Sequence, residues 1–257
     1  MQDAWIPAYR LTTEANFLGR FMKPQQTTKN AELKLFTSNS MRAVIGQLGS
    51  EFERASGHRL NVSFDPAKIM LRRIAAGETA DLAILGKAAI DSLAEEGRID
   101  RGSRRTLARC GVGIAVRAGA PRPDIGSVDA LKRALLEARS ITYTVEGASG
   151  MYFAGLIERL GIADAIKAKA RTVPGGLTAE LVANGEIEMA VQQVPELLAV
   201  QGVDLVGPLP QQVQNISVVT AGIFVDAKQR DAARALLDFL ITPASARVLR
   251  ARGLEPA

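Results

Sequence analysis

The sequence predicts an α/β protein of two lobes joined by two long strands, with a ligand cleft between the lobes. From residue 33 onward, short apolar strands alternate with amphipathic helices. Two long apolar segments, residues 106–117 and 217–225, carry internal glycines and are typical of strands that pass from one sheet to another. Several strands are followed by loops of small hydroxyl residues and glycine, and ligands bind at the carboxyl ends of strands in such sheets.

The first part of the chain predicts two consecutive strand–helix–strand units. In the first helix Val44, Leu48 and Phe52 share one face, and Gly57 ends it. Two such units in a row indicate a parallel sheet with right-handed crossovers. Strands and helices are expected alternately at residues 33–37, 41–56, 60–64, 69–76, 81–85 and 90–96.

The remaining elements continue the alternation. Ser127 is expected to cap the helix that follows it, and Pro243 to start the last helix. Strands are expected at residues 106–117, 140–145, 171–173, 188–192, 204–206 and 217–225. Helices are expected at residues 127–137, 150–160, 178–184, 196–200, 231–240 and 244–252.

The two long glycine-containing strands define the expected domains. The first lobe would hold residues 33–112 and 220–257, and the second lobe residues 113–219. Residues 1–32 are expected to form an N-terminal extension, which includes a linker at residues 24–28. Two α/β lobes joined by two strands form a hinge, and hinge closure around a ligand is a known mode of motion.

Composition excludes several kinds of partner and site. Aromatic residues make up 5% of the chain, which argues against stacking platforms for bases. The net charge is +5 and the basic residues are spread out, so we expect no nucleic-acid partner. A single His58 and a single Cys110 exclude a zinc-type site and make a Ser–His–Asp triad a poor fit, so neither metal nor cofactor is expected.

The chain also carries no segment typical of a membrane protein. No stretch approaches the roughly 20 apolar residues of a transmembrane helix. Residues 1–30 lack the apolar core of a secretory signal. We therefore expect no membrane span. Residues 1–30 do not identify the cellular compartment, and the cytoplasm is one option.

Loops after the first two strands predict an anion site. A helix N-terminus has unpaired N–H groups and the positive end of the helix dipole, so several termini facing one cleft would bind an anion. Ser38 and Ser40 surround one helix start, where capping would occupy one of them and ligand contact the other. Lys68 lies in the first turn of the next helix, where a cation is unfavourable unless it meets an anion or extends into solvent. Asp65 is expected either to cap this helix or to pair with Lys68.

The loop at residues 146–150, after a later strand, gives the clearest sequence signal for a ligand contact. Its glycines permit close backbone approach, so Ala148, Ser149 and Gly150 are expected to contact the ligand, with helix capping as the alternative for Ser149. Gln192 ends a buried strand and is expected to face the cleft, the alternative being an edge position in solvent. The candidates for acid–base chemistry are Lys68, Glu146, Asp65 and Tyr152.

In order and spacing, five segments resemble the molybdate-binding-protein-like group of type II solute-binding proteins, the substrate components of ABC transporters. The resemblance covers about residues 33–257, and its segments are residues 35–40, 74–84, 147–150, 181–188 and 207–210. It implies the two-lobed type II periplasmic-binding-protein fold, a small anionic ligand, an ABC-transporter permease as partner and a periplasmic location. In that group two loops each offer a Ser to the oxyanion, a role that falls on Ser38 or Ser40.

Two departures from the group pattern point to a different anion. The second loop, where the group has Ser residues, contains Lys68, and a cation suits a carboxylate. Gln192 and Gln193 stand where the group carries a Tyr. The resemblance with these departures implies an organic di- or tricarboxylate as ligand.

The same branch is similar to bacterial aconitate isomerases, which implies an alternative function. Such an enzyme moves a proton across the allylic system of an unsaturated tricarboxylate. Under this alternative Lys68, Ser40, Ser149 and Arg42 would clamp the carboxylates, and Lys68 or Glu146 would move the proton.

Overall fold

The computed structural model describes residues 30–257, of which Ala31–Ala257 forms one compact unit. The predicted extension and its linker therefore fall almost entirely outside the described residues. The strands are β1 (Glu32–Thr37), β2 (Arg59–Phe64), β3 (Leu82–Gly86), β4 (Arg105–Arg117), β5 (Ile141–Thr144), β6 (Ala170–Val173), β7 (Met189–Gln193), β8 (Val203–Pro208), β9 (Ile216–Ile223) and β10 (Glu255–Pro256).

Helices occupy most of the connections between these strands. The α-helices are α1 (Arg42–Ser56), α2 (Ala67–Ala75), α3 (Lys87–Glu95), α4 (Val128–Glu137), α5 (Ala148–Arg159), α6 (Ala163–Lys167), α7 (Ala179–Ala183), α8 (Val194–Leu198), α9 (Arg230–Leu240) and α10 (Pro243–Ala251). Short 3₁₀ helices are η2 (Asn39–Met41), η3 (Arg101–Ser103) and η4 (Gln211–Val213).

The strands pair in the order β2-β1-β3-β9-β4-β7-β5-β6. Strand β1 is parallel to both β2 and β3, and β5 is parallel to both β6 and β7, as the strand–helix alternation predicts. Strand β9 runs antiparallel to β3 and β4, and β4 runs antiparallel to β7. Two parallel blocks are thus joined through an antiparallel pair.

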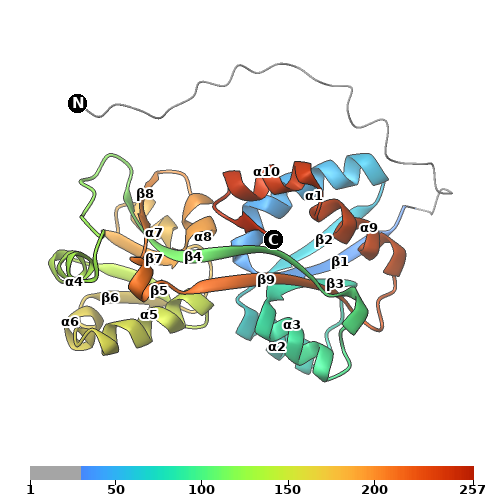
Figure 1. Ribbon diagram of the computed structural model, residues 1–257, viewed down its shortest axis with the longest axis horizontal. Coiled ribbons are helices and arrows are strands. Elements are labelled where there is room, and N and C mark those ends of the chain that lie inside the picture. Colours follow the sequence, from blue (N-terminus) through green and yellow to red (C-terminus); the bar gives the residue numbers. More distant parts are fainter. Residues whose placement is uncertain (1–29) are drawn as a thin grey trace, which may run out of the picture. The chain divides into compact units, whose positions relative to one another are not determined.

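Strands β4 and β9 lie side by side and connect the two halves of the unit (Figure 1). The first part of β4 pairs with β9 from Arg105 to Gly111, and its last part pairs with β7 from Val112 to Val116. A long strand can change partners in this way because both of its edges carry backbone donors and acceptors along its whole length.

Buried apolar side chains gather in separate cores on either side of this pair of strands. One large cluster includes Leu35, Leu48 and Leu236, and another includes Ile141 and Phe153. No cluster among the described residues mixes the two sets. The sequence predicts lobe boundaries between residues 112 and 113 and between residues 219 and 220. These boundaries concern where the unit would bend, and they stay a prediction.

Most elements lie where the sequence places them, with differences in short ones. Helix α6 is missing from the prediction because five residues are too few to display a helical period. Helix α8 begins at Val194 rather than residue 196, because Pro195 is accommodated in a first turn instead of preceding the helix. No helix within residues 30–257 is long and apolar enough to cross a membrane.

His58 and Cys110, which the sequence sets aside as metal ligands or catalytic residues, are both buried in the fold. His58 is buried between α1 and β2, where its Nδ1 accepts a hydrogen bond from the Ala31 N–H at 3.2 Å and its ring stacks on Phe52. Cys110 is a buried free thiol in β4, and burial raises its pKa to about 12. Both side chains are therefore part of the packing of the fold.

Candidate functional site

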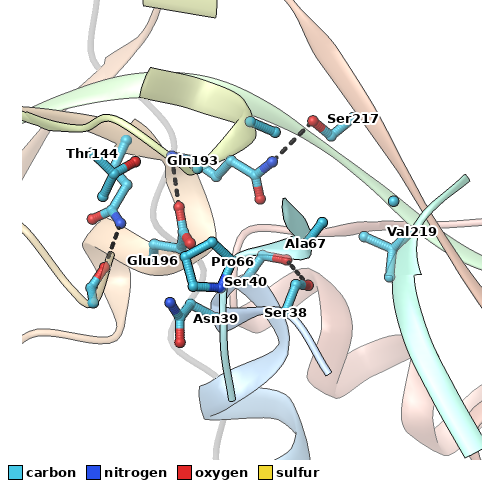
Figure 2. A pocket seen from close by; sticks show the side chains of 15 residues that line it. Ser38, Asn39, Ser40, Pro66, Ala67, Thr144, Gln193, Glu196, Ser217 and Val219 are labelled. Atoms are coloured by element: carbon cyan, nitrogen blue, oxygen red, sulfur yellow. Dashed lines mark hydrogen bonds between the residues drawn. The ribbon is translucent and has the colours of Figure 1, made fainter. Parts of the chain in front are cut away.

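A pocket lies between the two halves, at the ends of the strands where several helices start (Figure 2). About 550 Å³ of space, including the open solvent at the mouth, lies between the residues of the pocket. The residues that line it are Ser38, Asn39, Ser40, Pro66, Ala67, Gly86, Thr144, Gly147, Ala148, Gly176, Gln192, Gln193, Glu196, Ser217 and Val219.

Four helical segments start at this pocket without a side-chain cap. The N-cap residues are Ser38 for η2, Pro66 for α2, Gly86 for α3 and Gly147 for α5, and none of their side chains accepts from the helix. Proline and glycine have no side-chain acceptor that could do so. The N–H groups and positive dipole ends of these segments are therefore not met by a capping side chain, and they are the kind of donor that an anion accepts from.

The Ser38 and Ser40 hydroxyls contact each other at 2.8 Å on the floor of the pocket. Neither caps a helix: the backbone carbonyl of Ser38, not its hydroxyl, accepts from Met41. One of the two hydroxyls donates to the other, so the second keeps its proton for a ligand. The capping alternative considered for these two serines does not describe this geometry.

Thr144 ends β5 at the opposite wall of the pocket. Its side chain is 2% exposed, and its hydroxyl has no hydrogen-bond partner in residues 30–257. Gly147 and Gly150 make this wall possible, because a Cβ at Gly150 would lie 1.6 Å from the Thr144 carbonyl oxygen and one at Gly147 2.3 Å from its Oγ1. The loop therefore packs onto Thr144 and brings the start of α5 to the pocket.

Gln192 is buried and holds the neighbouring glycine turn. Its Oε1 accepts from the N–H and the hydroxyl of Thr178 at 3.0 and 2.9 Å, and its Nε2 donates to the Gly176 carbonyl at 2.8 Å. Gln193 donates to the Ser217 hydroxyl at 2.9 Å, which ties the end of β7 to strand β9. The solvent-edge alternative does not describe either glutamine, because both are buried.

Glu196 is the one titratable residue in the lining of the pocket within residues 30–257. It lies in α8 with 9% of its surface exposed, and its Oε2 accepts from the Gln193 N–H at 3.2 Å. Burial raises the pKa of this carboxyl to about 8, although the hydrogen bond from Gln193 acts in the opposite direction. A carboxyl with such a pKa holds or releases a proton near neutral pH.

Lysine and arginine side chains do not line this pocket in the described part of the chain. Lys68 is exposed and outside the lining, because Ala67 faces the pocket and the next helical residue is rotated by about 100°. Arg42 stands behind the lining, where it donates to the Asn39 side chain at 3.1 Å and stacks on Phe64. Negative charge in the pocket would thus be met by neutral donors.

The other acid–base candidates are engaged elsewhere. Glu146 pairs with Arg72 through two hydrogen bonds of 3.2 and 2.7 Å and does not line the pocket. Asp65 pairs with Arg73 at 2.5 Å instead of capping α2 or meeting Lys68. The Tyr152 hydroxyl donates to the Val213 carbonyl at 2.8 Å within its own half of the unit.

The predicted contact residues are thus divided by the structure. Ser38, Ser40, Ala148 and Gln192 meet at the pocket, whereas Lys68 and Glu146 do not. Ser149 and Gly150 follow directly in the first turn of α5, both buried, without being part of the lining. No group of three or more His, Cys, Asp or Glu side chains in residues 30–257 is placed to hold a metal ion.

Sequence reasoning missed Thr144, Glu196 and Ser217. The signal for Thr144 was its place at the end of a predicted strand, the same signal that identified Ser38. An acidic residue in the first turn of a helix, such as Glu196, is common as a partner of the helix dipole and therefore gives no indication of a site. Ser217 enters the pocket only through the pairing of β9 with β4.

Comparisons with known proteins agree on the fold. A family model described as a bacterial extracellular solute-binding protein matches residues 33–255. An aconitate isomerase from a Pseudomonas species is 32% identical over 230 residues, 87% of this chain and 87% of that protein. The molybdate-binding protein ModA of Azotobacter vinelandii is 28% identical over 237 residues, 87% of this chain and 89% of that protein.

A solved structure extends the likeness to three dimensions. The periplasmic molybdate-binding protein of Azotobacter vinelandii has a TM-score of 0.74 at 17% sequence identity, with 86% of this chain and 98% of that chain covered. This likeness confirms the predicted two-lobed periplasmic-binding-protein fold with its mixed α/β architecture.

Proposed function

Because the chain belongs to the bacterial extracellular solute-binding protein family, we propose that its pocket binds a small organic anion with two or three carboxylates. The observation that carries this proposal is the set of uncapped helical segments that start at the pocket, which leave their N–H groups and positive dipole ends without an acceptor. Under this proposal an ABC-transporter permease is the membrane partner.

The distribution of groups in the pocket favours an organic anion over an inorganic oxyanion. Polar donors stand on opposite walls, with the Ser38–Ser40 pair on one and Thr144 on the other. Apolar surface from Pro66 and Val219 is also part of the lining. A carbon chain with a carboxylate at each end matches this pattern, whereas a tetrahedral oxyanion would leave one wall unused.

The test is isothermal titration calorimetry with citrate, cis- and trans-aconitate and simple dicarboxylates, beside molybdate, sulfate and phosphate. We expect a carboxylate to bind more tightly than every inorganic anion. Ser40→Ala should weaken that binding by about tenfold, the value of a hydrogen bond to a charged group. Ser127→Ala, which removes the cap of α4 away from the pocket, is the matched control and should bind as the wild type does. If molybdate bound most tightly of all these anions, the proposal of a carboxylate ligand would be refuted.

Isomerisation of the bound acid is the second candidate function. It is favoured by the 32% identity to an aconitate isomerase and by Glu196, whose pKa of about 8 makes both protonation states accessible near neutral pH. In such a reaction a proton leaves one carbon, the double bond moves along the chain, and a proton is added at the other end. The acid is neither oxidised nor reduced in this step.

Proton NMR in D₂O separates binding from isomerisation. An isomerase would interconvert cis- and trans-aconitate and replace carbon-bound hydrogen with deuterium, and Glu196→Gln would abolish both. A solute-binding protein would bind the acids with neither change. Lys68→Ala tests the role assigned to Lys68 from the sequence: because Lys68 is exposed outside the pocket, we expect unchanged affinity.

A further inference from the structure

We propose that Glu196 lines the pocket as a neutral carboxylic acid and donates a hydrogen bond to the bound anion. The anion would then bind the form of the protein in which Glu196 is protonated. This inference rests on the proposed function, because it concerns the same pocket, and it adds a coupling between anion binding and pH. It holds whether or not the bound acid reacts further.

The surroundings of Glu196 provide no counter-ion for a negative charge. The carboxyl is 9% exposed, and the N–H of Gln193 is its one hydrogen-bond donor in residues 30–257. No cationic side chain is part of the pocket lining in that range. An ionised carboxylate that is buried without a cation is costly, so the neutral acid is the favoured form.

Among the described residues, charged side chains on the elements packed against α8 make no hydrogen bond or ion pair with Glu196, and Arg105, Arg109 and Arg117 of β4 are exposed. On β4, Cys110 is a thiol whose pKa burial raises to about 12, so it is uncharged. At the start of α1, Arg42 donates to Asn39 and not to Glu196. On β8, Asp204 pairs with Arg122 at 3.3 Å. Burial alone therefore raises the pKa of Glu196 to about 8, against the smaller effect of the Gln193 N–H.

The position of Glu196 determines what its proton does. Glu196 stands in the same lining as the Ser38–Ser40 hydroxyls and Thr144 (Figure 2). A carboxylate there would repel an anion held by the helix starts, whereas a carboxylic acid offers it an O–H donor. An arriving anion favours the protonated form further, since two like charges close together disfavour each other.

A purely structural role for Glu196 gives a different expectation. Glu196 accepts from the N-cap N–H of its own helix, as the acidic residue of a capping box does. Gln at this position can accept the same hydrogen bond through its amide oxygen and can also donate to an anion at any pH. Glu196→Gln thus keeps the cap and removes only the titration.

The experiment measures the Kd of trans-aconitate and of sulfate by calorimetry from about pH 7 to pH 9.5, where both probes are essentially fully ionised. For the wild type we expect a nearly constant Kd below pH 8 and about tenfold weaker binding for each pH unit above it. For Glu196→Gln the Kd should change less than about twofold over the whole range, since the amide does not titrate. Glu180→Gln, an exposed position on α7, is the matched control and should follow the wild type.

A second measurement does not depend on the variant. Titrations of the wild type near pH 9 in two buffers of different ionisation enthalpy should reveal the uptake of close to one proton for each anion bound. Binding that is independent of pH and takes up no proton would overturn the inference and leave the proposed function standing. Failure of both probes to bind at every pH would overturn the two together.

Discussion

At the scale of single residues, the pocket lining contains polar groups whose hydrogen bonding is incomplete within residues 30–257. The Thr144 hydroxyl is buried with no hydrogen bond, and the Ser38–Ser40 pair keeps one proton unused. A buried polar group without a partner costs roughly 1–3 kcal/mol, so such groups are rare unless a ligand completes them. Glu196 adds a carboxyl without a counter-ion to the same lining.

Thr144→Val tests whether this hydroxyl serves a ligand. Removal of an unpaired buried hydroxyl should leave the free energy of unfolding unchanged or raise it by up to about 1 kcal/mol, while the affinity for a carboxylate falls about tenfold. Thr142→Val is the matched control, since Thr142 is also buried and unpaired on β5 but does not line the pocket. Denaturant unfolding and calorimetry measure the two effects, and equal affinity losses in both variants would contradict the assignment.

Glu196 also predicts a pH dependence of stability. Its pKa is about 8 in the folded protein against an ordinary value of 4.5, so between these values the folded state binds one proton more than the unfolded state. The contribution of Glu196 to the free energy of unfolding is present below pH 4.5 and is lost as the pH rises to 8. The wild type should therefore lose stability relative to Glu196→Gln as the pH rises from 5 to 8. Urea unfolding of both proteins measures this difference. A constant difference would show that Glu196 is ionised throughout.

At the scale of elements, the residue that precedes a helix decides whether a side chain caps the first N–H groups. Helices α4 and α10 start away from the pocket and are capped by Ser127 and Thr242, whereas α2, α3 and α5 start at it after Pro66, Gly86 and Gly147. Helices α6, α7 and α9 also lack a side-chain cap, so the proposed site is marked by the meeting of several uncapped starts at one pocket.

Gly150→Ala tests the turn that brings α5 to the pocket. Its Cβ would lie 1.6 Å from the Thr144 carbonyl oxygen, so we expect a loss of about 3 kcal/mol or more in the free energy of unfolding. Gly46→Ala, at an exposed position of α1 where a Cβ meets nothing within 4 Å, should instead gain about 0.5–1 kcal/mol. Thermal unfolding of the two variants compares them directly, and a mild effect at Gly150 would mean that the loop has another packing.

The sequence allowed most elements and part of the site to be predicted. Strand ends followed by Ser or Gly gave Ser38, Ser40 and Ala148, because the chemistry of a helix start is local. Lys68 and Glu196 show the limit of that approach. Which side of a first turn faces the pocket, and whether a carboxyl is buried without a cation, depend on packing between segments far apart in the chain.

At the scale of the whole molecule, contacts across the pocket hold the two halves together. Arg72 on α2 pairs with Glu146, which precedes α5, and Gly175 lies so close to Pro66 that an added Cβ would be 2.7 Å from its Cγ. The paired strands β4 and β9 also connect these halves. A hinge that opens at these contacts would admit the ligand.

Arg72→Ala tests this closing contact. An exposed ion pair contributes up to about 1 kcal/mol, so its loss should shift the protein toward an open form and enlarge the radius of gyration measured by X-ray scattering without ligand. A saturating ligand should restore the compact value. Lys167→Ala, which removes an ion pair within one half, is the control and should change nothing. An unchanged radius for Arg72→Ala would mean that other contacts hold the halves closed.

The most direct test of the central claim is a titration of the ¹⁵N-labelled protein with trans-aconitate, followed in amide ¹H–¹⁵N NMR spectra. The claim is that uncapped helix starts bind a carboxylate anion. We expect the largest shifts at the amides of Ser40, Lys68, Lys87 and Ser149, which belong to four separate helical starts. Shifts confined to other regions, or no shifts at millimolar ligand, would contradict the account.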